Sequence, residues 1–239
     1  MATKEATALL KELINNNSLA AWATAFATFI LAFVAIFQDK IRAWIKRPKL
    51  NAEIVCAPPD CHQTKYNTVH KKGKYPITAE SYFFRMRIIN NGNKKAENVE
   101  VYAYKLERKQ SNNTYEKMNW FLPLNLVWTH YGTAFIEAIS PEMEKHCDLG
   151  VILKPQSRKD IDKQDIDYYD SSKTLFSLSV LVYPNTLTHL LKDGDYRLYL
   201  KIAASNTEPT EKILRIVIDG HWSDSEDEML RDHIKLSFL

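Results

Sequence analysis

The sequence has too few glycines and cysteines to build several common kinds of site. Its six glycines among 239 residues are scattered, so no glycine-rich loop of the type that cradles phosphates is present. Its three cysteines, Cys56, Cys61 and Cys147, are an odd number and suit a reducing compartment better than a disulfide framework. No nucleophile elbow, kinase-like signature or paired-histidine zinc motif occurs. We therefore expect a protein that is not an enzyme.

Two groups of potential metal ligands depart from the spacing that metal sites require. Cys56-x4-Cys61-His62, together with His146-Cys147, has the residue types of a zinc site but lacks a C-x2-C pair. An EF-hand loop starting at Asp160 would need Gly and Glu where Asp165 and Ser171 stand. We expect no bound metal and no cofactor, with a solvated loop around residues 160–170.

The residues from Leu19 to Phe37 are predominantly apolar and carry no formal charge. A helix of about 20 apolar residues crosses a bilayer, so we expect a transmembrane helix at residues 18–38. One alternative is a cleaved signal peptide, which would carry its basic residues in front of the apolar stretch rather than behind it. The other is a buried helix of a soluble protein, which the many alanines leave open.

Basic residues on the C-terminal side of this stretch predict its orientation. Residues 1–17 are nearly neutral and include an apolar face, so we expect a short N-terminal segment with an amphipathic helix. Residues 39–49 form a basic linker. Cytoplasmic flanks collect Lys and Arg, which predicts an outside N-terminus and a cytoplasmic C-terminal domain at a bacterial inner membrane. The residues expected at the membrane surface, in contact with lipid, are Lys40, Arg42, Trp44, Lys46, Arg47 and Lys49.

Small residues recur along the apolar stretch in steps of four and three. Small side chains let membrane helices approach closely, so this pattern predicts a homo-oligomer, for which we suggest four subunits. The alternative is chance placement, because Ala and Thr are common in membrane helices. The small-residue seam consists of Ala21, Ala25, Thr28, Ala32 and Ala35.

Residues 50–239 have the alternating pattern of an antiparallel sandwich. Segments such as SYFFRMRII, NVEVYAYKL, FSLSVLVYP, YRLYLKIAA and KILRIVID alternate apolar and polar residues, and polar turns separate them. Trp222 to Ile234 is the one window with a helical pattern, with Ser223 or Asp224 as the N-cap. The sequence thus predicts a mainly β cytoplasmic domain with a short C-terminal helix.

The segment RMRIINNGNKKAENVEVYAY resembles the strand, N-x-G turn and A-x-N-V strand of bacterial immunoglobulin-like domains. The resemblance covers about twenty residues and implies a fold rather than a function. Antibody domains are a poorer match because their Cys–Trp–Cys core is absent. The expected fold class is an N-terminal transmembrane helix followed by an antiparallel immunoglobulin-like β-sandwich.

Cations and tyrosines alternate in one loop and on the predicted outward strand positions. Cations that contact phosphates, combined with rings that stack on bases, suit a nucleotide or single-stranded nucleic acid. A plainly solvated face is the alternative, since the net charge is only +3. The candidate ligand-binding residues are Lys65, Tyr66, Lys71, Lys72, Lys74, Tyr75, Arg85, Arg87, Tyr102, Tyr104, Arg197, Tyr199 and Lys201.

The arrangement is similar to that of single-span effectors of bacterial anti-phage systems, in which a soluble sensor is joined to a membrane segment. This resemblance implies a homo-oligomeric membrane effector whose sandwich senses a ligand and controls membrane permeability. The alternative is a membrane-tethered scaffold or adaptor for a partner protein, with aromatics such as Trp120, Trp128 and Trp222 in the contact.

Overall fold

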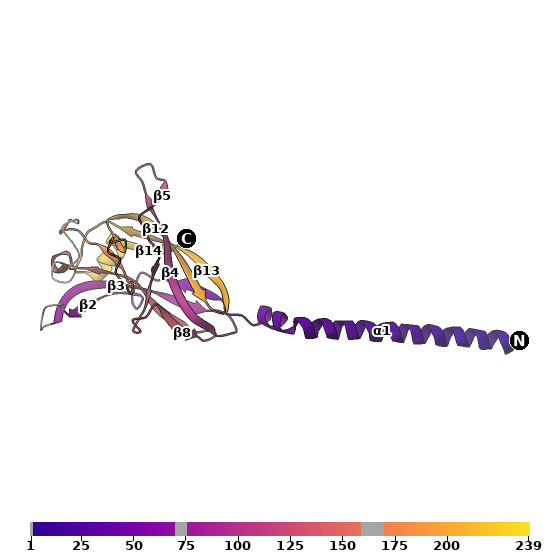
Figure 1. The fold of residues 1–239 in the computed structure, drawn as a ribbon. Coiled ribbons are helices and arrows are strands. Elements are labelled where there is room, and N and C mark those ends of the chain that lie inside the picture. Colours follow the sequence, from indigo (N-terminus) through magenta and orange to yellow (C-terminus); the bar gives the residue numbers. More distant parts are fainter. Residues whose placement is uncertain (1, 70–75, 159–169) are drawn as a thin grey trace. The chain divides into compact units, whose positions relative to one another are not determined.

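The computed structural model describes residues 2–69, 76–158 and 170–239, and the chain divides into two compact units, Met1–Lys46 and Arg47–Leu239. The first unit is a helix and the second is made largely of strands (Figure 1). An apolar N-terminal helix, two antiparallel sheets and a short C-terminal helix are all present. The predicted fold class is confirmed.

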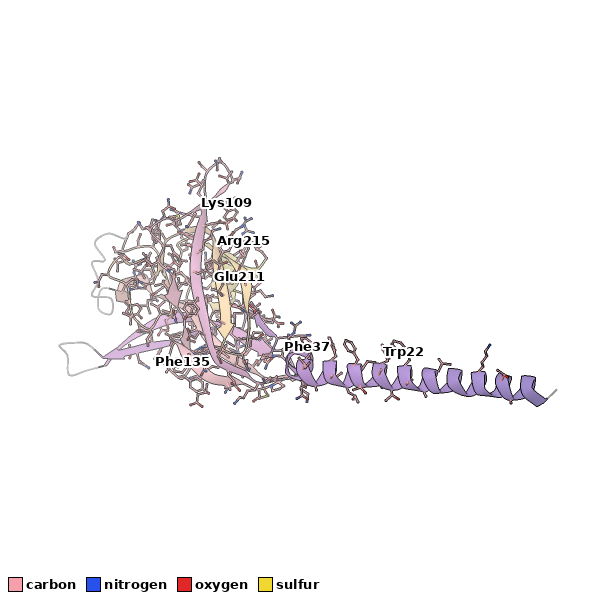
Figure 2. The ribbon with its side chains drawn as sticks, turned by 45° about the vertical axis from the view of Figure 1, so that its right-hand side comes forward. Trp22, Phe37, Lys109, Phe135, Glu211 and Arg215 are labelled. Atoms are coloured by element: carbon pink, nitrogen blue, oxygen red, sulfur yellow. The ribbon has the colours of Figure 1, made fainter. Side chains whose placement is uncertain are left out.

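Helix α1 runs without a break from Ala2 to Ile45. It therefore includes both the segment expected as a separate amphipathic helix, within residues 1–17, and most of the expected linker at 39–49. Its 44 residues, at 1.5 Å each, give a length of about 66 Å. The stretch Leu19–Gln38 has a mean hydropathy of 2.2 and none of it is buried in the protein. It is long and apolar enough to cross a membrane, and Figure 2 shows Trp22 projecting from it.

The first sheet, which we call sheet A, is organised around the long strand β3. One edge of β3 pairs with β9, while its other edge pairs first with β2 and then with β1. The strands of sheet A among the described residues are β1 (Leu50–Glu53), β2 (Cys61–Val69), β3 (Pro76–Asn90), β7 (Val127–Trp128), β9 (Glu144–Leu153), β10 (Phe176–Leu178) and β11 (Leu190–Leu191). A single turn of 3-10 helix, η1 (Pro155–Ser157), follows β9.

The second sheet, sheet B, is organised around β4 and β12. Their pairing places Lys201 opposite Tyr102 and Tyr199 opposite Lys105, with an extra residue at Tyr104 that forms a bulge. The strands of sheet B among the described residues are β4 (Ala96–Lys109), β5 (Tyr115–Lys117), β6 (Leu124–Asn125), β8 (Phe135–Ile139), β12 (Gly194–Ala204), β13 (Thr207–Ile218) and β14 (Ile234–Phe238).

The core contains the side chains at alternate positions of the two sheets. The inward positions expected from the alternating segments are fully or nearly fully buried: Phe84, Met86, Ile88, Val99, Val101, Ala103, Tyr196, Leu198, Leu200 and Ile202. Side chains between them point outward because successive strand residues face opposite sides of a sheet. Trp128 is completely buried, so it belongs to the core and not to a contact surface.

Two expected elements are shorter in the structure. The strand expected across FSLSVLVYP ends at Leu178; Val180 still forms an isolated bridge with Leu126, and Leu181 and Val182 are exposed. The C-terminal helix is the short α3 (Glu226–Glu228), capped by Ser225, followed by the π-helix η3 (Met229–His233). Ser223 is not the cap, since its hydroxyl accepts the Ser225 N–H and donates to Glu228.

Candidate functional site

The seam residues all lie in α1, and each is exposed in the single chain. The hydroxyl of Thr24 donates to the carbonyl of Ala20 at 2.9 Å, and that of Thr28 donates to the carbonyl of Thr24 at 2.8 Å. Both hydroxyls are therefore satisfied within their own helix. The seam offers close packing rather than unmet hydrogen bonds.

The residues expected at the membrane surface belong to both units. Lys40, Arg42 and Trp44 fall in the last part of α1, whereas the chain at Arg47 and Lys49 is already part of the sandwich. The backbone N–H of Arg47 donates to Asn93, and that of Lys49 donates to Asn90. The basic stretch thus ends where the sandwich begins.

The candidate ligand-binding residues do not form one surface. Lys65, Tyr66, Arg85 and Arg87 lie on β2 and β3 of sheet A. Tyr102, Tyr104, Arg197, Tyr199 and Lys201 lie on β4 and β12 of sheet B. Lys71, Lys72, Lys74 and Tyr75 lie outside the described residues. Outward positions of the two sheets of a sandwich face away from each other, so the two groups belong to opposite faces.

On the outer face of sheet B, tyrosines and cations contact each other in pairs. The Lys105 ammonium lies 4.1 Å from the ring centroid of Tyr199, and that of Lys201 lies 5.1 Å from the ring of Tyr104. The rings of Tyr104 and Tyr199 meet edge to face at 6.2 Å. Arg197 lies 3.7 Å from the ring of Tyr115. Four predicted residues, Tyr104, Arg197, Tyr199 and Lys201, take part in these contacts, together with Lys105 and Tyr115, which were not predicted; we call this row of side chains and the charged groups paired with it the ladder.

Carboxylates neutralise this ladder. Lys105 pairs with Glu107 at 2.7 Å and Lys201 pairs with Glu211 at 2.9 Å. Burial would raise the pKa of Glu107, but hydrogen bonds from Lys105 and Tyr199 lower it, so this carboxylate stays charged at neutral pH. The acidic groups of the ladder are nearly as many as its basic groups. The acids are Glu100, Glu107, Asp195 and Glu211, and the cations are Lys105, Lys109, Arg197, Lys201 and Arg215. Figure 2 labels Lys109, Glu211 and Arg215. A balanced face of this kind has little attraction for a phosphate backbone.

The two predicted arginines of sheet A are also paired with acids. Arg85 contacts Asp148 at 3.1 Å, and Arg87 contacts the buried carboxylate of Asp60 at 3.2 Å. The other oxygen of Asp60 lies 3.3 Å from the His146 ring. These contacts orient the arginines within the sheet surface.

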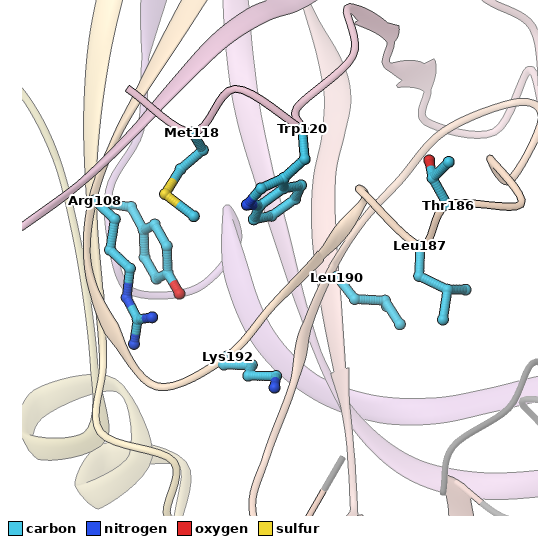
Figure 3. Close-up of a pocket in the computed structure, with 8 residues that line it drawn as sticks. Arg108, Met118, Trp120, Thr186, Leu187, Leu190 and Lys192 are labelled. Carbon is cyan, nitrogen blue, oxygen red and sulfur yellow. The ribbon is translucent and has the colours of Figure 1, made fainter. Parts of the chain in front are cut away.

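A pocket at one end of the sandwich differs from these charge-paired surfaces in the side chains that line it (Figure 3). It is a partly open cavity of about 300 Å³ between residues from both sheets and their loops. Its wall contains the half-exposed ring of Trp120 and two cations, Arg108 and Lys192, and the described lining residues include no Asp or Glu. The lining residues are Arg108, Met118, Trp120, Thr186, Leu187, Leu190, Lys192 and Tyr196.

Two contacts position the guanidinium of Arg108. It lies 5.6 Å from the ring centroid of Tyr196, and one of its nitrogens donates to the carbonyl of Asp193 at 2.9 Å. Arginine has five N–H donors, so further donors remain for an anionic ligand. Trp120 supplies a ring face on which a planar ligand can stack. Apolar walls with a few placed polar groups are typical of small-molecule sites.

Of these lining residues, Trp120 is a candidate from the sequence, but for a protein contact and not for a ligand pocket. The lining comes from the end of β4, the segment after β5, the loop before β11 and the start of β12. No local motif joins these segments, so the sequence carried no signal for the site.

The cysteines lie in buried or half-buried positions of the sandwich. Burial raises the pKa of Cys147 well above its ordinary value, and its thiol contacts the Val127 carbonyl. The neighbouring Cys56 thiol, together with burial, raises the pKa of Cys61. In the described part of the chain, the one group that brings three potential ligand atoms within 4.8 Å of one another is Asp219, His221 and His233.

The pocket of Figure 3 is the candidate ligand site, because it combines a ring, two cations and a partly open cavity. The ladder on sheet B is the candidate contact surface. Comparisons with known protein families, curated proteins and solved structures found no match to this chain.

Proposed function

We propose that the chain is a membrane-anchored effector whose sandwich binds a small anionic ligand in the end pocket and thereby controls membrane permeability. One observation carries the proposal: an uncovered apolar helix of spanning length is joined to a domain with a pocket whose described lining residues include two cations and a tryptophan. The basic flank supports an outside N-terminus and a cytoplasmic sandwich at a bacterial inner membrane. A role in anti-phage defence fits this arrangement.

The ligand is a nucleotide of about mononucleotide size. Arg108 and Lys192 supply the positive charge for a phosphate, and Arg binds phosphate through paired N–H donors. Trp120 supplies the stacking face for a base, a contact that contributes about 1–3 kcal/mol. A cavity of about 300 Å³ favours a single nucleotide over a nucleic-acid strand.

The output depends on assembly of α1 through the small-residue seam, with four copies as the suggested number. A ligand shifts an assembly between two states only if it binds one of them more tightly. Small side chains support such a change because closely packed membrane helices are held by packing rather than by hydrophobic drive.

Binding is tested with the full chain in detergent micelles, using a panel of mononucleotides and inorganic phosphate, with tryptophan fluorescence and calorimetry as readouts. We expect saturable nucleotide binding that Arg108→Gln and Lys192→Gln each weaken. Lys109→Gln is the matched control, since Lys109 lies beside Arg108 in sequence but faces Asp195 on the outer surface. No binding of any nucleotide, or equal affinity in all three variants, would exclude the pocket as the sensor site.

The membrane output is tested by expression in bacteria with a membrane-impermeant dye. Ala25→Leu should abolish dye entry while the protein stays in the membrane, whereas Ala23→Leu, on the opposite side of α1, should not. Mass determination of the detergent-solubilised particle provides a second readout. A monomeric particle would rule out the permeability function.

A second candidate function is a tethered adaptor for a partner protein, and the ladder on sheet B favours it. Half-buried tyrosines with balanced charges resemble the composition of protein interfaces more than that of nucleic-acid sites. An adaptor would cause no dye entry with any ligand. In that case Tyr104→Ala and Tyr199→Ala should release a co-purifying partner without unfolding the domain.

A further inference from the structure

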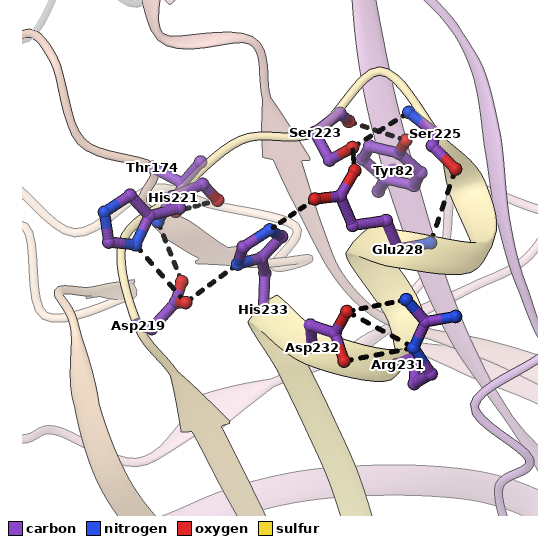
Figure 4. A network of polar contacts seen from close by, with 10 residues as sticks. All are labelled: Tyr82, Thr174, Asp219, His221, Ser223, Ser225, Glu228, Arg231, Asp232 and His233. Carbon is purple, nitrogen blue, oxygen red and sulfur yellow. Dashed lines mark hydrogen bonds and ion pairs between the residues drawn. The ribbon is translucent and has the colours of Figure 1, made fainter.

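We propose that Asp219, His221 and His233 form a binding site for a transition-metal dication, for which Zn²⁺ is best suited. Asp219 follows the last residue of β13, His221 comes two residues later, and His233 ends η3 (Figure 4). One ligand atom from each lies within 4.8 Å of the others. This site is independent of the end pocket and of the membrane output.

Both imidazoles present their Nδ1 atom to the same carboxylate oxygen. His233 Nδ1 lies 2.8 Å from Asp219 Oδ2, and His221 Nδ1 lies 3.3 Å from it. With zinc bonds of about 2.0–2.1 Å to nitrogen and oxygen, neighbouring ligand atoms of a tetrahedral site are about 3.4 Å apart. Both Nδ1–Oδ2 distances are close to this value, and no two of the three ligand atoms are more than 4.8 Å apart, so small side-chain movements would admit an ion.

The turn at Gly220 brings His221 close to the Asp219 carboxylate. Gly220 has φ of +88°, a backbone conformation that favours glycine, and a Cβ there would lie 3.3 Å from the Asp193 Cβ. The turn lets the backbone N–H of His221 donate to Asp219 Oδ1 at 2.8 Å. That bond holds the carboxylate in place and leaves Oδ2 directed at the two imidazoles.

A second carboxylate, that of Glu228, lies on the Nε2 side of the His233 ring, opposite Asp219. Glu228 Oε1 lies 3.8 Å from His233 Nε2, and its other oxygen accepts a hydrogen bond from the Ser223 hydroxyl at 2.7 Å. At 3.8 Å this is an ion-pair contact; a hydrogen bond formed by closer approach would orient the imidazole and hold its proton on Nε2, away from the metal. Figure 4 shows this line of groups from Ser223 through Glu228 and His233 to Asp219 and His221.

The donor set suits zinc. Two imidazoles and a carboxylate bind Zn²⁺, and three protein ligands leave a position open for water or an outside ligand. The His221 side chain is 75% exposed, so an ion can enter from solvent.

The test uses the full chain in detergent micelles, without a polyhistidine tag and after treatment with a chelator. Zn²⁺ is titrated by calorimetry and Co²⁺ by its visible absorption. We expect one ion per chain and a higher melting temperature with Zn²⁺. Asp219→Asn and His221→Ala should each weaken binding by more than about tenfold, and Glu228→Gln by about tenfold.

Asp232→Asn is the matched control, because Asp232 is an exposed acid on η3 that pairs with Arg231. It should bind zinc as the wild type does. His221→Ala carries the test even if His233→Ala unfolds, since His221 is on the surface. A wild-type chain that binds no zinc, or unchanged affinity in Asp219→Asn and His221→Ala, would overturn the proposal.

Discussion

The buried side-chain oxygen of Asn90 accepts the backbone N–H of Lys49 at 3.1 Å, which fastens the start of the sandwich to the end of β3. The same oxygen accepts the N–H of Gly92 at 3.0 Å. Its NH2 group donates to the carbonyls of Lys94 at 2.7 Å and Ile139 at 3.1 Å. Every hydrogen-bonding position of this amide is used. Asn90 therefore joins three separate segments of the chain in the protein interior.

Replacing Asn90 by leucine should destabilise the sandwich strongly. The change leaves the N–H groups of Lys49 and Gly92 without their acceptor, and each buried orphan group costs about 1–3 kcal/mol. We expect the free energy of unfolding to fall by about 3 kcal/mol, as measured by urea titration of the micelle-bound chain. Asn91→Ala, at the exposed neighbouring position, should change it by less than about 0.5 kcal/mol. Equal midpoints for the two variants would contradict the role of the amide.

The turn after Asn90 should tolerate no side chain at Gly92. A Cβ there would lie 2.5 Å from the Lys49 nitrogen and 2.7 Å from the Pro48 carbonyl carbon, and backbone atoms cannot move aside cheaply. We expect Gly92→Ala to cost about 3 kcal/mol. Gly132→Ala is the control, because a Cβ there meets nothing within 4 Å and only the left-handed φ of +64° opposes it, at about 1 kcal/mol. Thermal unfolding should rank the two variants in that order.

The parts of the fold that depend on local patterns could be predicted from the sequence. The alternation in β3, β4 and β12 identified the buried positions, and the uncharged run identified the spanning helix. Alternation tells which residues share a face of one sheet but not which sheet a strand joins. For this reason Arg85 and Tyr104 were expected on one surface, although they lie on opposite faces of the sandwich.

The two candidate small-ligand sites depend on tertiary structure. The pocket combines Arg108, Trp120 and Lys192 from segments that only the packed sheets bring together. Asp219 and His221 are close in sequence, whereas His233 is brought to them by the π-helix η3. The hydrogen-bond spacing of a π-helix differs from that of the α-helix on which sequence patterns are based.

Removing the buried carboxylate of Asp60 should cost far more than removing its exposed neighbours. Asp60 accepts hydrogen bonds from Arg87 at 3.2 Å and from the Val55 N–H at 3.0 Å, and its side chain is 2% exposed. Asp60→Ala removes the acceptor of the Val55 N–H and leaves Arg87 with only its longer contacts to exposed acids, so we expect a loss of about 3–5 kcal/mol. Glu53 and Glu144 contact the same arginine at 3.8 and 3.6 Å from exposed positions. Their Gln variants should each lose less than about 1 kcal/mol in the same urea titration.

Acid should weaken the fold through His189. Burial lowers the pKa of this imidazole from 6.5 to about 4, and the residue is 2% exposed. Above pH 6.5 the folded and unfolded states both carry neutral His189, so it contributes no pH dependence. Between pH 6.5 and about 4 only the unfolded chain takes up the proton, and the free energy of unfolding falls by about 3 kcal/mol.

His189→Gln removes this titration, so its loss of stability between pH 7 and pH 4 should be smaller than that of the wild type by about 3 kcal/mol. Carboxylates such as Asp195, whose pKa is lowered by the Arg215 guanidinium, titrate in both proteins and cancel in the comparison. His130→Asn, which removes an exposed imidazole, should keep the full wild-type loss. Parallel stability curves for the wild type and His189→Gln across this range would mean that the buried ring takes up its proton as readily in the folded chain as in the unfolded one.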